Sequence, residues 1–176
     1  MRFTPSRIAG AWVIDITPIA DHRGFFATTW LPEVFRQHGI DPTLAQCNLA
    51  FNHKRGTLRG MHFQEAPHAQ AKIVRATRGA LLDVIVDLRD QSPTYRRWDS
   101  VELSADNRRM LYMPEGIAHG YLTLTDDVEA YYHASAAWAP QAESGVRWDD
   151  PAFGISWPFE PVVISEKDRY WPLVSG

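Results

Sequence analysis

Prolines and glycines interrupt this chain so often that little of it can form long helices. The 176 residues contain 12 prolines and 11 glycines, and these residues gather in turn-forming clusters. The segments between the clusters are short and rich in β-branched and aromatic residues, a pattern typical of strands. Strands joined by short turns without intervening helices predict a mostly β protein, an antiparallel sandwich or barrel.

The expected elements can be placed along the chain. A short helix is predicted over 32–38, opened by Pro32 and ended by Gly39. The turn at 77–79 predicts a hairpin that joins 72–76 to 80–88. We expect one domain over 1–176, in which the Trp- and Pro-rich 139–176 forms an irregular arm over the barrel mouth. Strands are expected at 12–16, 25–30, 45–51, 57–64, 72–76, 80–88, 101–104, 109–113, 116–124 and 128–134.

Charge and hydropathy narrow the classes of partner. The net charge is -3 and no basic block is present, so a nucleic acid partner is not expected. No apolar run approaches a membrane span, and the first residues lack the apolar core of a signal peptide. The lone Cys47 cannot form an internal disulfide, which favours a reducing cytoplasm.

The segment Thr57–Gln64 places a guanidinium and an imidazole three residues apart in an apolar run. A buried arginine needs an anionic partner, and phosphate suits the guanidinium fork. Histidine can exchange a proton near neutral pH. The pair therefore predicts chemistry on a phosphorylated small molecule. Because Arg59 and His62 have opposite strand parity, both can face one cavity only if the backbone twists or bulges at Gly60.

Several other polar side chains fall in apolar strand segments. Tyr132 and Lys72 each lie on the apolar face of their strand, and Asp83 is a carboxylate among apolar neighbours. The structural alternatives stay open at this point. Tyr132 can be a core tyrosine bonded at its tip, Lys72 can reach solvent from its strand end, and His62 and His119 can be hydrogen-bonded core histidines.

The sequence offers little support for a metal or a cofactor. Gln64 stands two residues after His62, where a β-barrel metal site would need another ligand. Dinucleotide-binding, P-loop and nucleophile-elbow motifs are absent. The other five histidines lie in turns or polar surroundings and are expected on the surface; they are His22, His38, His53, His68 and His133.

Six motifs that occur in order carry a specific resemblance. They are Asp21-x-Arg23-Gly24-x-Phe26, Gln46-x-Asn48, Leu58-Arg59-Gly60-Met61-His62-Phe63-Gln64, Ala69-Gln70-x-Lys72, Pro114-Glu115-Gly116-x-Ala118-His119-Gly120 and Ser165-Glu166-Lys167-Asp168. Over about residues 3–169 the chain closely resembles the dTDP-4-dehydrorhamnose 3,5-epimerase family. The resemblance implies a cupin-type jelly-roll barrel with a few short helices. It also implies a cofactor-independent isomerase that inverts C3 and C5 of a nucleoside-diphosphate 4-keto-6-deoxy sugar, of the dTDP-4-dehydro-6-deoxyglucose to dTDP-4-dehydrorhamnose type.

The resemblance also implies a role for individual residues. His62 would be the base, oriented by Asp168, and Tyr132 would return a proton from the opposite face of the sugar. Lys72 would stabilise the enolate oxygen. The expected substrate contacts are Arg59 and His119 for the diphosphate, Gln46 and Asn48 for the nucleotide, Glu143 and Lys167 for further parts of the substrate, and Arg23 with Phe26. In relatives Arg23 reaches in from a neighbouring subunit, which implies a homodimer with exchanged N-terminal strands.

Two positions depart from the family pattern. Thr28 stands where relatives usually carry a glutamate that helps to bind the nucleotide, and Trp138 stands where many carry a tyrosine stacked on the base. Tryptophan can still stack. The alternatives are therefore an epimerase of the same family that acts at C3 only or on a non-thymidine nucleotide sugar, and, in other classes, a non-catalytic jelly-roll sugar-binding module or a metal-dependent cupin enzyme.

Overall fold

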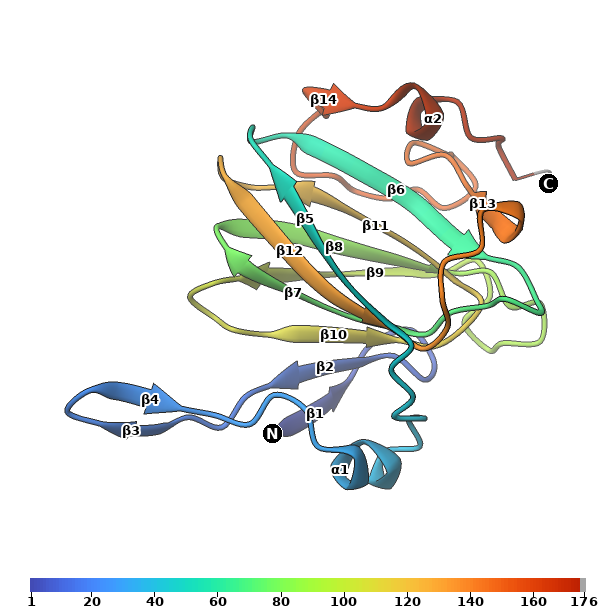
Figure 1. The fold of residues 1–176 in the computed structure, drawn as a ribbon. Helices are drawn as coiled ribbons and strands as arrows, with labels where there is room; N and C mark the ends of the chain where they lie inside the picture. The colour runs from blue at the N-terminus through green and yellow to red at the C-terminus, as the bar shows by residue number, and fades with distance from the viewer. Residues whose placement is uncertain (175–176) are drawn as a thin grey trace.

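Two facing β-sheets form the body of the molecule (Figure 1). The computed structural model describes residues 1–174. One sheet has the strand order β1-β2-β10-β7-β12-β5, and the other has the order β13-β6-β11-β8-β9 with β14 beside β6. The first sheet contains β1 (Arg2–Pro5), β2 (Trp12–Asp15), β5 (Gln46–Asn52), β7 (Lys72–Arg78), β10 (Met110–Met113) and β12 (Val128–Ala134). The second contains β6 (Thr57–Gln64), β8 (Ala80–Asp87), β9 (Trp98–Ser104), β11 (Ile117–Thr123), β13 (Glu143–Gly145) and β14 (Val163–Ile164).

From β5 onward the chain crosses repeatedly from one sheet to the other. The strands β5, β7, β10 and β12 lie in the first sheet, whereas β6, β8, β9 and β11 lie in the second. This alternation of antiparallel strands is the topology of a jelly roll. The mostly β prediction is confirmed, and nearly every expected strand overlaps an observed one.

The predicted hairpin of 72–76 with 80–88 is wrong. A turn does follow at Gly79, where φ is +67°. However, β7 pairs with β10 and β12, and β8 pairs with β9 and β11. The chain bends at Gly79 and switches sheets instead of folding back on itself. A tight turn in the sequence fits both geometries, because strands can also change sheets through a sharp bend.

The core has an inner and an outer part. Apolar residues such as Val74 of β7, Ile85 of β8 and Ala130 of β12 pack between the two sheets. The outer face of the second sheet is also apolar, at Val84 and other residues, and the segment after residue 145 covers it. The expected arm of 139–176 was placed over the barrel mouth; much of it packs against this outer face instead. Its last residues, 175–176, lie outside the described part of the chain.

The N-terminal region combines a packed helix with an exposed hairpin. Helix α1 (Pro32–Gln37) matches the prediction and buries Phe35 against the outer face of the first sheet. By contrast β3 (Ile19–Asp21) and β4 (Gly24–Phe26) pair only with each other and are exposed throughout. The strand expected over 25–30 therefore ends at Phe26. Figure 1 shows this hairpin projecting away from the two sheets. None of the helices within residues 1–174 has the length and apolar character needed to cross a membrane.

Two of the five histidines expected on the surface are partly buried. His38 stacks on Phe3 with ring centroids 3.9 Å apart. His133 is half-buried, and burial together with the positive charge of Arg75 lowers the pKa of its imidazole. Both lie on the outer face of the first sheet, which the N-terminal segment covers, and this contact between distant segments has no local signal in the sequence. His22, His53 and His68 are exposed as expected.

Candidate active site

Gly60 resolves the parity conflict between Arg59 and His62. Its φ of +119° belongs to a region that favours glycine, and the pairing of β6 with β11 shifts register at this point. A Cβ atom on Gly60 would lie 2.5 Å from the Cα atom of Gly120 on β11. The irregularity breaks the strict alternation of side chains along β6, and Arg59 and His62 line the same cavity.

His62 is paired with Asp168. Its Nε2 atom lies 2.5 Å from Oδ1 of Asp168, and Oδ2 of Asp168 accepts a hydrogen bond from the backbone N–H of Gly60 at 3.2 Å. Asp168 belongs to helix α2 (Glu166–Arg169), whose first turn is capped by the hydroxyl of Ser165. Burial by itself would raise the pKa of Asp168, but the hydrogen bonds and the charge of His62 outweigh it and hold the pKa below its usual value. The carboxylate is therefore ionised at neutral pH.

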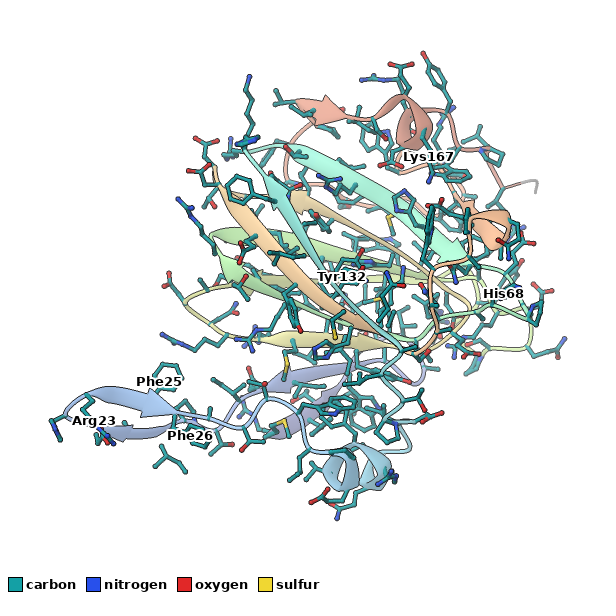
Figure 2. All side chains as sticks on the ribbon, viewed as in Figure 1. Arg23, Phe25, Phe26, His68, Tyr132 and Lys167 are labelled. Atoms are coloured by element: carbon teal, nitrogen blue, oxygen red, sulfur yellow. The ribbon has the colours of Figure 1, made fainter. Side chains whose placement is uncertain are left out.

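Lys72 and Tyr132 reach the same space from the first sheet. Together with His62 they line both a cavity of about 340 Å³ and an adjoining one of about 170 Å³. Burial lowers the pKa of Lys72 to about 8, although the carboxylates of Asp83 and Glu143 oppose the shift. Burial raises the pKa of Tyr132. Tyr132, labelled in Figure 2, packs against the core between the two sheets. Near neutral pH the site thus holds a cation and a protonated phenol.

A second histidine–carboxylate pair faces the first. His119 of β11 is aligned with His62 of β6, and its Nε2 atom lies 3.0 Å and 3.1 Å from the two carboxylate oxygens of Asp83. Asp83 is completely buried and His119 is 9% exposed. The buried carboxylate therefore holds the imidazole of His119 in one orientation. His119 lines the smaller cavity with Arg59.

Arg59 is more open than its apolar neighbours suggested. The side chain is exposed, so the assumption that the run Thr57–Gln64 buries it is wrong. Its Nε–H donates to Oδ1 of Asn52 at 2.8 Å, and within residues 1–174 it forms no ion pair. A cation that projects into a cavity without a carboxylate partner can accept an anionic ligand.

The residues expected to contact the nucleotide lie at one end of the larger cavity. Gln46, Asn48 and Trp138 line it. The side-chain amide of Gln46 donates to Asn48 at 2.6 Å and accepts from the backbone N–H of Trp138 at 2.8 Å. The indole of Trp138 is 58% exposed, so its ring is accessible for stacking.

Glu143 and Lys167 meet across the cavity rim. Glu143 lines the larger cavity, and its Oε1 atom lies 2.5 Å from Nζ of Lys167. The Lys167 ammonium also lies 5.6 Å from the ring of Trp171. In Figure 2 Lys167 stands on α2.

Three expected contact residues are not brought to the site by this chain. Arg23, Phe26 and Thr28 are exposed and line neither cavity. Figure 2 shows Arg23 and Phe26 on the projecting hairpin, far from Tyr132. The side chain of Arg23 instead forms an ion pair with Asp21.

Comparison with known proteins decides the family. The family model described as dTDP-4-dehydrorhamnose 3,5-epimerase matches residues 5–175. The chain is 44% identical over 174 residues to a dTDP-4-dehydrorhamnose 3,5-epimerase of Methanothermobacter thermautotrophicus, covering 97% of this chain and 92% of the relative. The chain belongs to the dTDP-4-dehydrorhamnose 3,5-epimerase family. The predicted family, isomerase class and jelly-roll fold are thereby confirmed.

Two further relatives bear on structure and specificity. A crystal structure of dTDP-4-dehydrorhamnose 3,5-epimerase from Bacillus anthracis with TDP and PPi bound superposes with a TM-score of 0.94 at 36% identity, covering 98% of this chain and 99% of that one. A dTDP-4-dehydro-6-deoxyglucose 3-epimerase from a Streptomyces species is 41% identical over 174 residues, covering 97% of this chain and 88% of the relative. The chain is thus about equally similar in sequence to a relative named as a 3,5-epimerase and to one named as a 3-epimerase.

Sequence reasoning assigned no role to several residues that line the epimerase cavities. They are Ala50, Phe63, Gln64, Gln70 and Tyr121. Gln64 donates to the backbone oxygen of His68 and accepts from the backbone N–H of Ala139, and Gln70 donates to the oxygen of Ala136. These amides fix the segment that carries Trp138. For Gln64 the available signal was its strand parity with His62. Within residues 1–174 there is no group of three or more His, Cys, Asp or Glu side chains that could hold a metal ion.

Proposed function

We propose that this chain inverts C3 and C5 of a dTDP-linked 4-keto-6-deoxy sugar, with His62 as the base and Tyr132 as the acid. One observation carries the assignment. The His62–Asp168 pair comes from the second sheet and its α2 neighbour, whereas Tyr132 comes from the first sheet, and His62 and Tyr132 line the same cavity. A sugar ring held between the sheets would present opposite faces to the two groups, as inversion requires.

The proposed chemistry is proton transfer next to a ketone. The 4-keto group acidifies the C–H bonds at C3 and C5. Neutral His62 takes a proton from one of these carbons, and the electron pair of the broken C–H bond moves into the enolate centred on the C4 oxygen. The ionised Asp168 stabilises the resulting imidazolium. Tyr132 then protonates the carbon from the opposite face, and both groups regain their protonation states by exchange with solvent. The raised pKa of Tyr132 keeps the phenol protonated for this step.

Lys72 would stabilise the enolate oxygen. Its pKa of about 8 leaves most of the side chain as ammonium at neutral pH. A positioned donor aimed at developing negative charge typically contributes about 3–4 kcal/mol to transition-state stabilisation.

The remaining cavity residues would hold the nucleoside diphosphate. Within residues 1–174 Arg59 has no carboxylate partner, and His119 lines the same cavity, so the smaller cavity suits the diphosphate. Gln46, Asn48 and Trp138 would contact the nucleotide. Glu143, with Lys167 paired to it, would contact the sugar side of the larger cavity.

The projecting hairpin supports a homodimer with exchanged N-terminal strands. Ile19, Phe25 and Phe26 are 70%, 47% and 69% exposed. A monomeric protein rarely exposes a cluster of such large apolar side chains. In a second copy the hairpin would bring Arg23, Phe26 and Thr28 to the cavity rim that they do not reach within one chain. We also propose a cytoplasmic location, in keeping with the free, exposed Cys47.

Deuterium incorporation tests the reaction. The purified protein is incubated in D₂O with dTDP-4-keto-6-deoxyglucose, and the sugar is examined by NMR. We expect label at both C3 and C5. Label at C3 alone would favour the C3-only alternative, which the similarity to a Streptomyces 3-epimerase keeps in view. No label at either carbon would favour a sugar-binding module without catalysis.

A further inference from the structure

The inner face of β5 carries a stripe of polar side chains that is interrupted by Ala50. Gln46, Asn48, Ala50 and Asn52 alternate along the strand and therefore share one face. The first three line the two cavities. Asn52, at the end of the stripe, lines neither cavity and is 2% exposed. It is a buried amide directly behind the site, and the reaction described above gives it no role.

The side chain of Asn52 is fully engaged. Its Oδ1 atom accepts the Nε–H of Arg59 at 2.8 Å, and its Nδ2 atom donates to the backbone oxygen of Val128 at 3.2 Å. The hydroxyl of Tyr121 lies 3.2 Å from Nδ2 and 3.4 Å from Oδ1. Val128 belongs to the first sheet, whereas Arg59 and Tyr121 belong to the second. One amide thus connects the two sheets at this end of the barrel.

These bonds restrict the guanidinium of Arg59. An exposed arginine side chain normally samples many rotamers, and ordering it costs free energy when a ligand binds. Here the Nε–H is held by Asn52, and one Nη2 hydrogen points toward the backbone oxygen of Phe51 at 3.4 Å. Within residues 1–174 Nη1 has no bonded acceptor. The guanidinium is therefore anchored on its inner edge, and its remaining donors are free on the side of the smaller cavity that His119 and Tyr121 also line.

We propose that Asn52 is a positioning residue for diphosphate recognition: it fixes the plane of the Arg59 guanidinium and the hydroxyl of Tyr121 before substrate binds. The inference rests on the role given to Arg59 under the proposed function. Because Asn52 is buried, it does not touch the substrate and acts only through these two side chains. It should therefore govern affinity for the diphosphate and leave proton transfer intact.

Binding of dTDP by isothermal titration calorimetry tests the proposal. Asn52→Ala removes the acceptor for Arg59, so we expect the Kd to rise about tenfold, the size of one hydrogen bond to a charged group. Turnover at saturating substrate should change less than about twofold, because the His62 and Tyr132 positions are unaffected. Asn52→Asp keeps the shape of the side chain but pairs its charge with Arg59. It should weaken dTDP binding at least as much and reduce the salt dependence of the affinity.

Combination with Arg59→Met separates positioning from a general effect on stability. If Asn52 acts chiefly through Arg59, the two losses are less than additive, and the double variant binds dTDP only slightly more weakly than Arg59→Met alone. Asn107→Ala is the matched control, because Asn107 holds a β9–β10 turn through bonds to Ser104 and Glu102. It should lower thermal stability without changing the Kd.

Three results would overturn the inference. The first is wild-type dTDP affinity in folded Asn52→Ala and Asn52→Asp while Arg59→Met binds weakly. The second is additive losses in the double variant. The third is unchanged affinity in Arg59→Met itself, which would also remove Arg59 from the proposed function. In that case deuterium exchange at C3 and C5 would still show whether the proton-transfer part of that function holds.

Discussion

The catalytic cavity and the β3–β4 hairpin of this chain are built in opposite ways. His62, Lys72 and Tyr132 lie on strands of two six-stranded sheets that are paired on both sides, and Asp168 is 4% exposed. The hairpin pairs only with itself and exposes its apolar side chains. The cavity needs nothing from outside the chain to bring its proton-transfer groups together. The hairpin carries Arg23 and Phe26, which line neither cavity of their own chain and which we propose contact the substrate of a second copy.

The difference suggests that the residues of one chain suffice for proton transfer, whereas a second copy of the chain contributes to nucleotide recognition. Proton transfer tolerates little misplacement, and strands fixed on both sides supply rigidity. Nucleotide recognition can be shared with a second copy. Substitutions in the cavity should therefore change rates, whereas substitutions in the hairpin should change assembly and affinity.

The largest effect is expected at His62. His62→Ala removes the proposed base, so both turnover and deuterium exchange at C3 and C5 should fall by about 10²–10⁴-fold. The measurement is NMR of the dTDP sugar in D₂O. His53→Ala, which alters an exposed histidine, serves as the control. Exchange that continues at the wild-type rate in His62→Ala would show that another group abstracts the proton.

Tyr132→Phe separates the two halves of the reaction. Removal of the proposed acid should reduce inversion by about 10²-fold or more, yet His62 can still remove and return a proton on its own face. Exchange without inversion should therefore persist at the carbon that His62 addresses, as followed by NMR of the recovered substrate. If exchange and inversion both remain near normal, Tyr132 is not the acid.

Lys72 should impose an alkaline limit on activity. The ammonium form is needed and its pKa is about 8, so the charge is present below that pH and is lost as the pH rises through it. The kcat/KM of the wild type should then fall above about pH 8. Lys72→Gln should lower kcat by about 10²–10³-fold and abolish this limb of the pH profile. A limb that survives in the variant belongs to another group.

A substitution in the hairpin should change the oligomeric state and the affinity for dTDP more than the rate of proton transfer. Phe26→Asp places a charge on an apolar side chain that is 69% exposed in the single chain, and we expect it to disrupt the proposed dimer. Sedimentation velocity would show a monomer, and the Kd for dTDP should rise about tenfold because Arg23 of the partner is lost. Val162→Asp, at a side chain that is 71% exposed, is the control. A wild-type protein that sediments as a monomer would refute strand exchange.

The smallest effect is expected at the Glu143–Lys167 pair on the rim. Both side chains are partly exposed, and ion pairs of this kind contribute about 0–1 kcal/mol to stability. Lys167→Ala should therefore leave the melting temperature within a few degrees of wild type and raise KM only severalfold. A loss of thermal stability comparable with that of a core substitution would show that the pair anchors α2.

The sequence predicted the elements well because their signals are local. Thr57–Gln64 matches β6, and Pro32 and Gly39 bracket α1 as expected. The pairing of β7 with β8 was predicted wrongly because a glycine turn does not show whether the chain folds back or changes sheets. Arg59 was expected to be buried because its neighbours in the strand are apolar. Strand composition does not show which side chains remain exposed at a cavity. The role of Gln64 depends on the backbone of Ala139, which is distant in sequence.

The close pairing of β6 with β11 at Gly60 and Gly120 limits how this cavity can be redesigned. A Cβ atom on Gly60 would collide with the backbone of Gly120, and one on Gly120 would lie 2.6 Å from Sδ of Met61. Saturation libraries at these two codons should therefore return only glycine among active clones. Diversity aimed at new sugars or bases has to be introduced elsewhere, at positions such as Ala50 or Trp138, where the wall of the cavity has room to change.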